Sequence, residues 1–282
     1  MEALFMIQII TDSAADFEPC ELERLQITCI PLKVMFGQQE YEENISLGKH
    51  QFYELLLQHE DLPKTSQASP QVLMDLFEDA HTNGDDAIYI TLSSAISGTY
   101  QNACMTRNLL GYEDCHVLDS RNATGGQRLL VQHACALRDA GKSAQEIIAA
   151  IEDVRDRIVL YACIDTLEYL YKGGRISQTV YKLGTLANIK PIITVEPDGG
   201  IGVPMKAMGM RKGMDILCKQ MEQKKPDPAF PVYAMFTNNR SVAETLAKKM
   251  GNVDDDHIIQ VGAAIGSHVG PDACGLVYVA AK

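Results

Sequence analysis

Short apolar segments alternate with segments of helical period over the first half of the chain, and this alternation is the strongest constraint on its fold. The predicted strands lie at residues 5–10, 27–36, 86–91 and 116–118. The predicted helices lie at residues 49–59, 70–83, 100–110, 125–140 and 144–157. Parallel strands need long crossover connections, which helices usually supply. The first half therefore predicts βαβ units on a parallel sheet.

The pattern changes after residue 157. Further strands are predicted at residues 158–164, 189–195, 201–207, 232–236, 258–261 and 276–280, and helices lie between some of them at about residues 210–223 and 242–250. The turn Pro197-Asp198-Gly199-Gly200 favours an antiparallel hairpin between two of these strands. This order is typical of an α+β arrangement. We therefore predict two domains, residues 1–160 and residues 161–282.

Charge and composition exclude several classes of function. The 282 residues include 37 acidic and 25 basic side chains, a formal net charge of −12. Such a charge disfavours binding to nucleic acid or to an anionic membrane surface. No segment approaches the ~18 apolar residues of a spanning helix, and the N-terminal segment lacks the basic region of a signal peptide. Because Trp is absent, aliphatic side chains must line any ligand site, which would suit a flexible apolar ligand.

The eight cysteines are separated from one another, and no C-x-x-C pair occurs. Neither a zinc site nor a redox pair is therefore indicated. Several cysteines stand in apolar runs, where Cys behaves as a small buried hydrophobic residue. We expect reduced thiols, no metal and no cofactor, in a soluble protein of the cytoplasm.

Four loops that precede predicted helices in the first half are rich in hydroxyl groups. They are Thr11-Asp12-Ser13, Thr65-Ser66, Ser93-Ser94 with Ser97-Gly98-Thr99, and Asp119-Ser120. Helix capping alone explains any one of them, but loops at the carboxyl ends of parallel strands also form the ligand crevice of such folds. The Ser97-Gly98-Thr99 turn opens a helix, so its N–H groups favour an anion. With only Lys64 and Arg121 as basic residues in these loops, a carboxylate is favoured over a phosphate.

Two glycine-rich segments of the second half carry basic side chains. Lys172 and Arg175 flank a Gly pair, and they either form a basic contact for an acidic partner or simply accompany a helix C-terminus. His268 is predicted to lie in a glycine-containing loop. It could donate a hydrogen bond to an anion, act as an acid or base, or have a structural role. No P-loop and no G-x-S-x-G, H-E-x-x-H or G-x-G-x-x-G motif is present, so no catalytic motif indicates an enzyme.

Taken together, seven segments of the sequence resemble the DegV family of bacterial proteins. They are TDSAAD (11–16), KTSQAS (64–69), SSAISGTY (93–100), DSRNATGGQ (119–127), LEYLYKGGRIS (167–177), KPI (190–192) and HVGPDACG (268–275). The resemblance implies a three-layer α/β/α domain with a parallel sheet, followed by a smaller α/β domain with a mixed sheet. It also implies a long-chain fatty acid bound in a tunnel between the domains. Some members are the non-catalytic, lipid-binding subunit of a fatty acid kinase, and present the carboxylate to a separate ATP-binding partner.

The resemblance also assigns roles to individual residues. It implies that Thr65 and Ser97 hold the carboxylate together with the Gly98 N–H, and that His268 reaches the same head group. It places Lys172 and Arg175 where the kinase partner would bind. One departure is Asp272, in a Gly-Pro-Asp segment where the family commonly has Gly-Pro-Gly. A carboxylate close to His268 would weaken the binding of an anion there.

Magnitudes indicate how such a ligand would be held. Burying a tail of roughly sixteen carbons at ~0.8 kcal/mol per CH₂ yields on the order of 10 kcal/mol, whereas each head-group hydrogen bond contributes ~1–3 kcal/mol. The leading hypothesis is therefore a fatty-acid-binding protein and not an enzyme. Two alternatives stay open. One is a stand-alone enzyme that uses Ser97 or His268 on an acyl or phosphorylated substrate, and the other is a regulatory module that carries a lipid.

Overall fold

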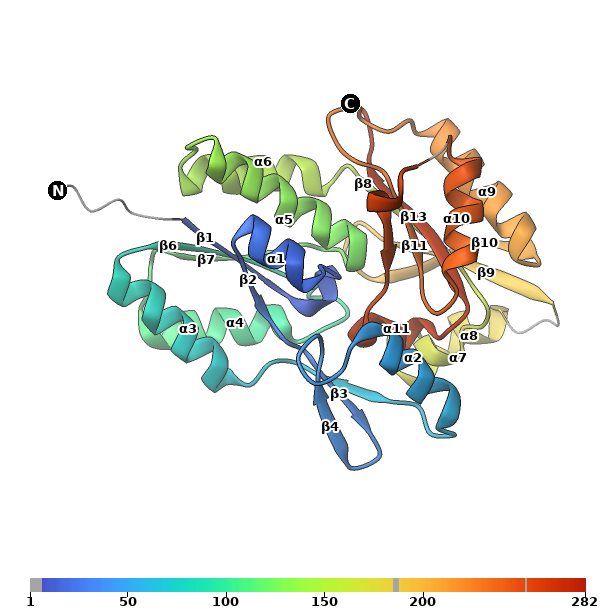
Figure 1. Cartoon of the computed structure of the whole chain (residues 1–282), viewed down its shortest axis with the longest axis horizontal. Coiled ribbons are helices and arrows are strands. Elements are labelled where there is room, and N and C mark those ends of the chain that lie inside the picture. Colours follow the sequence, from blue (N-terminus) through green and yellow to red (C-terminus); the bar gives the residue numbers. More distant parts are fainter. Residues whose placement is uncertain (1–6, 185–187, 252) are drawn as a thin grey trace.

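The computed structural model describes residues 7–184, 188–251 and 253–282, and its first sheet contains four parallel strands in the order β2-β1-β6-β7 (Figure 1). These strands are β1 (Ile7–Asp12), β2 (Ile27–Ile30), β6 (Asp86–Thr91) and β7 (Cys115–Asp119). Helices α3 (Pro70–Asn83) and α4 (Thr99–Leu110) cover one face, and α5 (Thr124–Asp139) and α6 (Ala144–Arg155) cover the other. The expected three-layer arrangement is confirmed. Phe5 and Met6, at the start of the first predicted strand, lie outside the described residues.

The second sheet is mixed and has six strands in the order β10-β9-β8-β13-β11-β12. They are β8 (Ile158–Ile164), β9 (Ile189–Val195), β10 (Ile201–Met208), β11 (Tyr233–Phe236), β12 (Ile258–Gln260) and β13 (Ala273–Val279). Strands β11 and β12 pair in parallel, and the other pairs are antiparallel. The predicted hairpin is present, with Gly199 at a φ of 87° in its turn. Helices α9 (Met210–Gln223) and α10 (Arg240–Lys249) cover one face of this sheet.

A third, antiparallel sheet was not predicted. Its order is β4-β3-β5, and its strands are β3 (Lys33–Phe36), β4 (Gln39–Glu42) and β5 (Lys64–Ser66). The single extended segment predicted at residues 27–36 is therefore two strands of different sheets. Pro31 separates them because it has no N–H for a ladder, and the Leu32 N–H donates instead to Ser13 Oγ. Residues 64–66, predicted as loop, pair with β3.

Several short helices complete the chain. They are α1 (Pro19–Leu25), α2 (Lys49–Gln58), α7 (Glu168–Lys172), α8 (Gln178–Gly184), α11 (Ala263–Val269) and the 3₁₀ turns η1 (Ser13–Ala15) and η2 (Asp255–His257). Helix α1 was not predicted; its seven residues start with a capping box between Glu18 and Glu21. His268 was predicted in a loop, but it lies in the last turn of α11, which ends at Gly270 with a φ of 84°.

Helix α5 lies between the two large sheets and contributes to a core that both share. One hydrophobic cluster contains Ile9 and Ile88 of the first sheet together with Leu160 and Val277 of the second. The predicted boundary at residue 160 falls within β8, and we keep the division into residues 1–160 and 161–282 as a proposal. None of the described helices is long and apolar enough to cross a membrane.

Candidate functional site

A cavity of about 390 Å³ lies between the loops of the first sheet and one face of the second sheet. Its walls are mostly aliphatic, with side chains from β8, β9, β11 and α11. Its polar lining includes Thr65, Ser97, Gly98 and His268. An apolar pocket with a few convergent polar groups is the usual form of a small-molecule site. The structure thus brings all four residues predicted to bind a carboxylate to one cavity.

Thr65 and His268 are in direct contact, although 203 residues separate them in the sequence. Thr65 is the central residue of β5 and lies opposite Val34 of β3, while His268 is held on α11. The Thr65 Oγ1 atom lies 2.8 Å from His268 Nε2. The unpredicted third sheet therefore positions Thr65, and α11 positions His268.

The imidazole of His268 is neutral at neutral pH. Burial, assisted by the positive charge of Arg175, lowers its pKa to about 4. The Nδ1 atom is buried and has no hydrogen-bond partner among the described residues. A hydrogen on Nδ1 would be a buried donor without an acceptor, so we assign the hydrogen to Nε2. In that tautomer Nε2 donates to Thr65 Oγ1, and the Thr65 hydroxyl keeps its own hydrogen for a ligand oxygen.

Gly173 allows the ring to occupy this position. A Cβ at Gly173 would lie 2.2 Å from His268 Nδ1 and 2.9 Å from the Tyr169 carbonyl oxygen. Any larger residue would therefore displace the imidazole. The Gly pair after α7 thus ends the helix, and its first member, Gly173, also leaves room for the His268 ring.

Ser97 and Gly98 lie at the N-terminus of the twelve-residue helix α4. The Thr99 N–H donates to Ser97 Oγ, which also lies 2.9 Å from Thr99 Oγ1. Within the described part of the chain, the Gly98 N–H has no hydrogen-bond acceptor. A Cβ at Gly98 would lie 2.9 Å from Gln67 Oε1, so Gln67 packs against this backbone. A free N–H and the positive end of a helix dipole both favour an anion.

Arg175 and Lys172, which the resemblance assigned together to a partner surface, lie in different environments. Arg175 is half-buried and lines the cavity, and its Nε donates to the Ile96 carbonyl oxygen at 3.0 Å. Lys172 is exposed and forms an ion pair with Glu168 at 2.6 Å. The position of Arg175 in the cavity wall was not predicted, because it depends on the contact with the Ile96 carbonyl group of a distant loop.

The substitution at Asp272 leaves the turn intact. Asp272 is exposed, and the positive φ of this segment falls on Gly270. Apart from burial, the influence that lowers the pKa of His268 comes from Arg175. Asp272 is therefore not among the groups that shift the pKa of His268, and the expected repulsion between Asp272 and an anion at His268 is not seen.

Two of the predicted hydroxyl-rich loops do not line the cavity. In the first, Thr11 Oγ1 donates to the Ile90 carbonyl oxygen, and Asp12 accepts from the Leu92 N–H at 2.7 Å. In the second, Asp119 accepts from the Ser94 N–H at 3.1 Å. These side chains connect the ends of neighbouring strands, so their role is structural.

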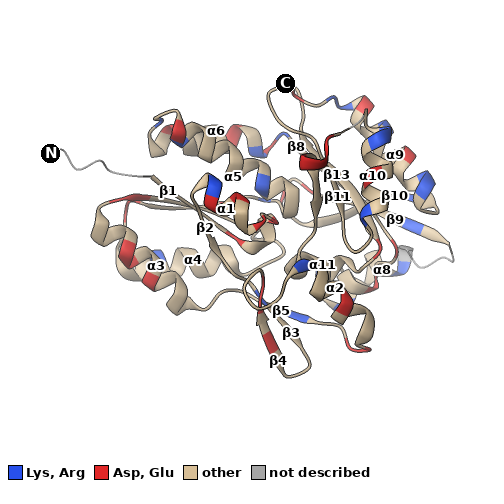
Figure 2. Cartoon of the chain, in the orientation of Figure 1, with Lys and Arg blue, Asp and Glu red and all other residues tan. Residues whose placement is uncertain are grey.

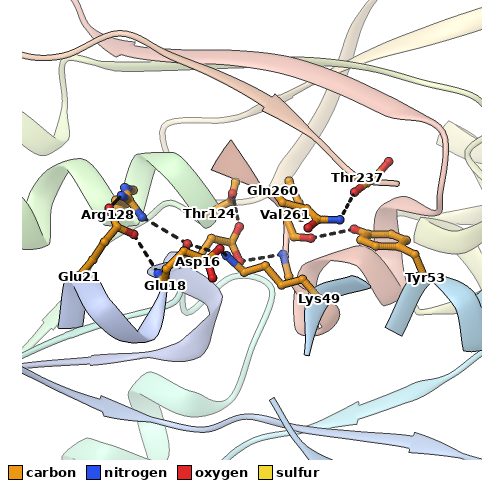
Figure 3. Close-up of polar contacts among 11 residues, drawn as sticks. Asp16, Glu18, Glu21, Lys49, Tyr53, Thr124, Arg128, Thr237, Gln260 and Val261 are labelled. Atoms are coloured by element: carbon orange, nitrogen blue, oxygen red, sulfur yellow. Dashed lines mark hydrogen bonds and ion pairs between the residues drawn. The ribbon is translucent and has the colours of Figure 1, made fainter. Parts of the chain in front are cut away.

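A buried acidic network supports the site and was not predicted, and Figure 3 shows the part of it around Asp16. Asp16 accepts from the Gly262 N–H at 2.9 Å and from the Thr124 hydroxyl. Glu43 accepts from the Ala264 N–H at 3.0 Å. Burial raises the pKa of Asp16 to about 6 and that of Glu43 to about 7. Both carboxyls thus hold the first turn of α11, one turn before His268.

The basic residues of this network donate to carbonyl and carboxylate groups of the protein, and they do not line the cavity. Lys49 is buried and donates to the Asp16 carbonyl oxygen at 2.9 Å and to Glu18 at 2.7 Å. Arg128 bonds Glu21 and the Asp16 carbonyl oxygen. Elsewhere, Figure 2 shows acidic and basic residues interspersed on the outer helices of both halves. An anion must therefore be bound by local groups of the cavity, because the net charge opposes its capture.

All eight cysteines are free. Among the residues that the structure describes, no group of three or more His, Cys, Asp or Glu side chains is placed to hold a metal ion.

Comparison with known sequences identifies relatives over nearly the full length. The model of the DegV family of uncharacterised proteins matches residues 6–281. A DegV domain-containing protein from Caldanaerobacter subterraneus subsp. tengcongensis is 33% identical over 276 residues, which cover 96% of this chain and 98% of the relative. The protein DegV of Bacillus subtilis is 31% identical over 280 residues, with the same coverage of both chains.

Solved structures share the fold. A crystal structure of DegV, a fatty acid binding protein from Bacillus subtilis, has a TM-score of 0.85 at 28% identity and covers 98% of this chain and 100% of that chain. A structure described as fatty acid binding of a DegV family protein from Thermus thermophilus has a TM-score of 0.88 at 24% identity, with the same coverage. At that lower identity the second likeness concerns the fold alone.

Proposed function

Because the chain belongs to the DegV family, we propose that it binds a long-chain fatty acid in this cavity, with the carboxylate at Thr65, Ser97, Gly98 and His268. The observation that carries the proposal is the cavity itself, in which aliphatic walls meet this convergent set of polar groups. The similarity to the fatty acid binding protein of Bacillus subtilis supports the same ligand class.

Three groups in the proposed head-group site donate to the carboxylate. They are the Thr65 hydroxyl, oriented by His268 Nε2, the Ser97 hydroxyl and the Gly98 N–H at the start of α4. Hydrogen bonds to an ionised acceptor contribute ~1.5–3 kcal/mol each. The positive charge of Arg175 acts on the same end of the cavity. His268 is a positioning residue in this arrangement, since its neutral ring fixes the direction of the Thr65 hydroxyl.

The acyl chain supplies most of the affinity. Each CH₂ that leaves water contributes ~0.8 kcal/mol, so a tail of roughly sixteen carbons outweighs the head group several-fold. Loss of one head-group donor should therefore weaken binding without abolishing it.

We extend the proposal to a subunit role in a fatty acid kinase, in which a separate ATP-binding protein phosphorylates the bound carboxylate. The segment between exposed Lys172 and cavity-lining Arg175 supports this, because a partner that contacts Lys172 would lie close to the head-group end. We place this role in the cytoplasm, where free thiols stay reduced.

The stand-alone enzyme has less support. A serine nucleophile needs a base within hydrogen-bond reach. Here Ser97 bonds Thr99, and His268 bonds Thr65.

Lipid extraction and native mass spectrometry of the purified protein test the proposal. We expect one long-chain fatty acid per chain, and a wild-type protein that neither carries nor takes up fatty acid would refute it. Turnover of an acyl ester or a phosphate ester by the protein alone, lost in Ser97→Ala, would favour the enzyme instead.

A further inference from the structure

Four residues lie side by side across the sheet face that lines the cavity, and the two in the middle have small side chains. In the strand register, Ala162 of β8 lies opposite Ile193 of β9 on one side and Gly275 of β13 on the other. Gly275 in turn lies opposite Met235 of β11. All four residues line the cavity. Since the two central residues have at most a methyl side chain, the row forms a trough between Ile193 and Met235.

The depth of this trough depends on Gly275. A Cβ at Gly275 would lie 3.0 Å from Ala162 Cβ, 3.0 Å from Met235 Cε and 2.8 Å from the Tyr161 carbonyl oxygen. These distances are shorter than ordinary van der Waals contact, so a side chain at this position would displace its neighbours or rise into the cavity. The absence of a side chain at Gly275 therefore keeps the floor of the cavity low at this point.

The next row on the same face of the sheet, two residues along each strand, bounds the trough on one side. Leu160 lies opposite Val277, and both belong to the core beneath α5. A Cβ at Gly125 of α5 would lie 2.4 Å from Val277 Cγ1 and 3.2 Å from Met235 Sδ, so the helix packs directly on this row. Leu160 lines the cavity, and Val277 does not. Leu160 therefore forms the wall of the cavity where α5 packs on the sheet.

We infer that the Ala162–Gly275 trough and the Leu160 wall determine the length of the acyl chain that the protein accepts. This inference rests on the proposed fatty acid function. The terminal carbons of a chain held at its carboxylate end must stop at a fixed depth, and a methylene too many meets side chains that α5 holds in place. One methylene in a hydrophobic pocket changes affinity about 10- to 200-fold.

Two substitutions change the space in opposite directions. Leu160→Ala removes three carbons from the wall, and Ala162→Val adds two carbons to the trough. Ala234→Val is the matched control, because Ala234 is buried on β11 in a core cluster of the opposite sheet face and does not line the cavity. Circular dichroism and thermal unfolding identify any variant that does not fold, and Leu160→Val replaces Leu160→Ala if that variant unfolds.

The experiment measures dissociation constants for saturated fatty acids from ten to twenty carbons. We expect Leu160→Ala to shift the preferred length by about two or three carbons upward. Ala162→Val should weaken the longest chains at least about tenfold more than the shortest, and Ala234→Val should keep the wild-type preference. An unchanged length preference in both cavity variants would overturn the inference while leaving the proposed function intact. Absence of fatty acid binding by the wild-type protein would refute the function itself, and the inference with it.

Discussion

The contact between Gly173 and His268 provides a sharp test of the head-group geometry. In the variant Gly173→Ala, the new Cβ would lie 2.2 Å from His268 Nδ1. Ordinary contact begins at 3.4 Å, so the ring would have to move by about 1.2 Å, the difference between the two distances. A hydrogen bond tolerates a few tenths of an ångström. The ring therefore cannot keep its 2.8 Å bond to Thr65 Oγ1.

Strain in the displaced ring is present in the free and the bound protein alike, so the loss of affinity comes from the Thr65 hydroxyl, which is no longer oriented toward the carboxylate. One hydrogen bond to an ionised acceptor contributes ~1.5–3 kcal/mol. A loss of about 2 kcal/mol corresponds to a fall in affinity of roughly thirtyfold. Since the acyl chain contributes on the order of 10 kcal/mol, binding should be weakened and not abolished.

Titration calorimetry with palmitate measures this difference, and ¹⁵N shifts of the imidazole report whether the His268 ring has moved. Gly48→Ala is a suitable control, because Gly48 has a negative φ of −75° and no atom within 4 Å of a new Cβ. Equal affinities in Gly173→Ala and Gly48→Ala, with the His268 resonances displaced only in the first, would refute the proposed role of this ring.

Three further predictions concern the hydroxyl, the buried acid and the exposed lysine. Thr65→Val should lower fatty acid affinity about tenfold, whereas Thr65→Ser should retain most of it; calorimetry showing equal losses would contradict a role for the hydroxyl. The pKa of Glu43 is raised from 4.5 to about 7, so between these pH values the folded state keeps a proton that the unfolded state releases. The free energy of unfolding should therefore fall by about 3 kcal/mol as the pH rises from 4.5 through 7. Urea unfolding at several pH values should show a smaller fall in Glu43→Gln, and the same fall would show that another group is responsible. Lys172→Glu should leave fatty acid affinity unchanged but weaken capture of a kinase partner in a pull-down, and undiminished capture would argue against this contact.

Local sequence signals were sufficient for much of the fold. Alternating apolar and helical segments predict the parallel sheet, and the Pro197–Gly200 turn predicts the hairpin of the second sheet. These features are local, since each depends on residues within one strand, helix or turn. The third sheet was missed because β5 is a polar strand of three residues, Lys64–Ser66, whose only reason to be extended is its pairing with β3.

The residues of the site were predictable, but the residues that support them were not. Motif resemblance singled out Thr65, Ser97, Gly98 and His268, and the structure places them in one cavity. Their roles at a head group remain a prediction. The support beneath them was not foreseeable, because Asp16 bonds Gly262 across 246 residues of sequence. An acidic residue at the end of TDSAAD gives no local indication that its partner is the first turn of a distant helix.

The central claim is that a fatty acid lies in the cavity with its carboxylate at the start of α4. A crystal structure of the protein with palmitate tests it most directly. We predict the carboxylate oxygens within hydrogen-bond distance of Thr65 Oγ1, Ser97 Oγ and the Gly98 N–H, with the acyl chain over Ala162. Palmitate bound with its carboxylate away from these three groups, or outside the cavity altogether, would contradict the account.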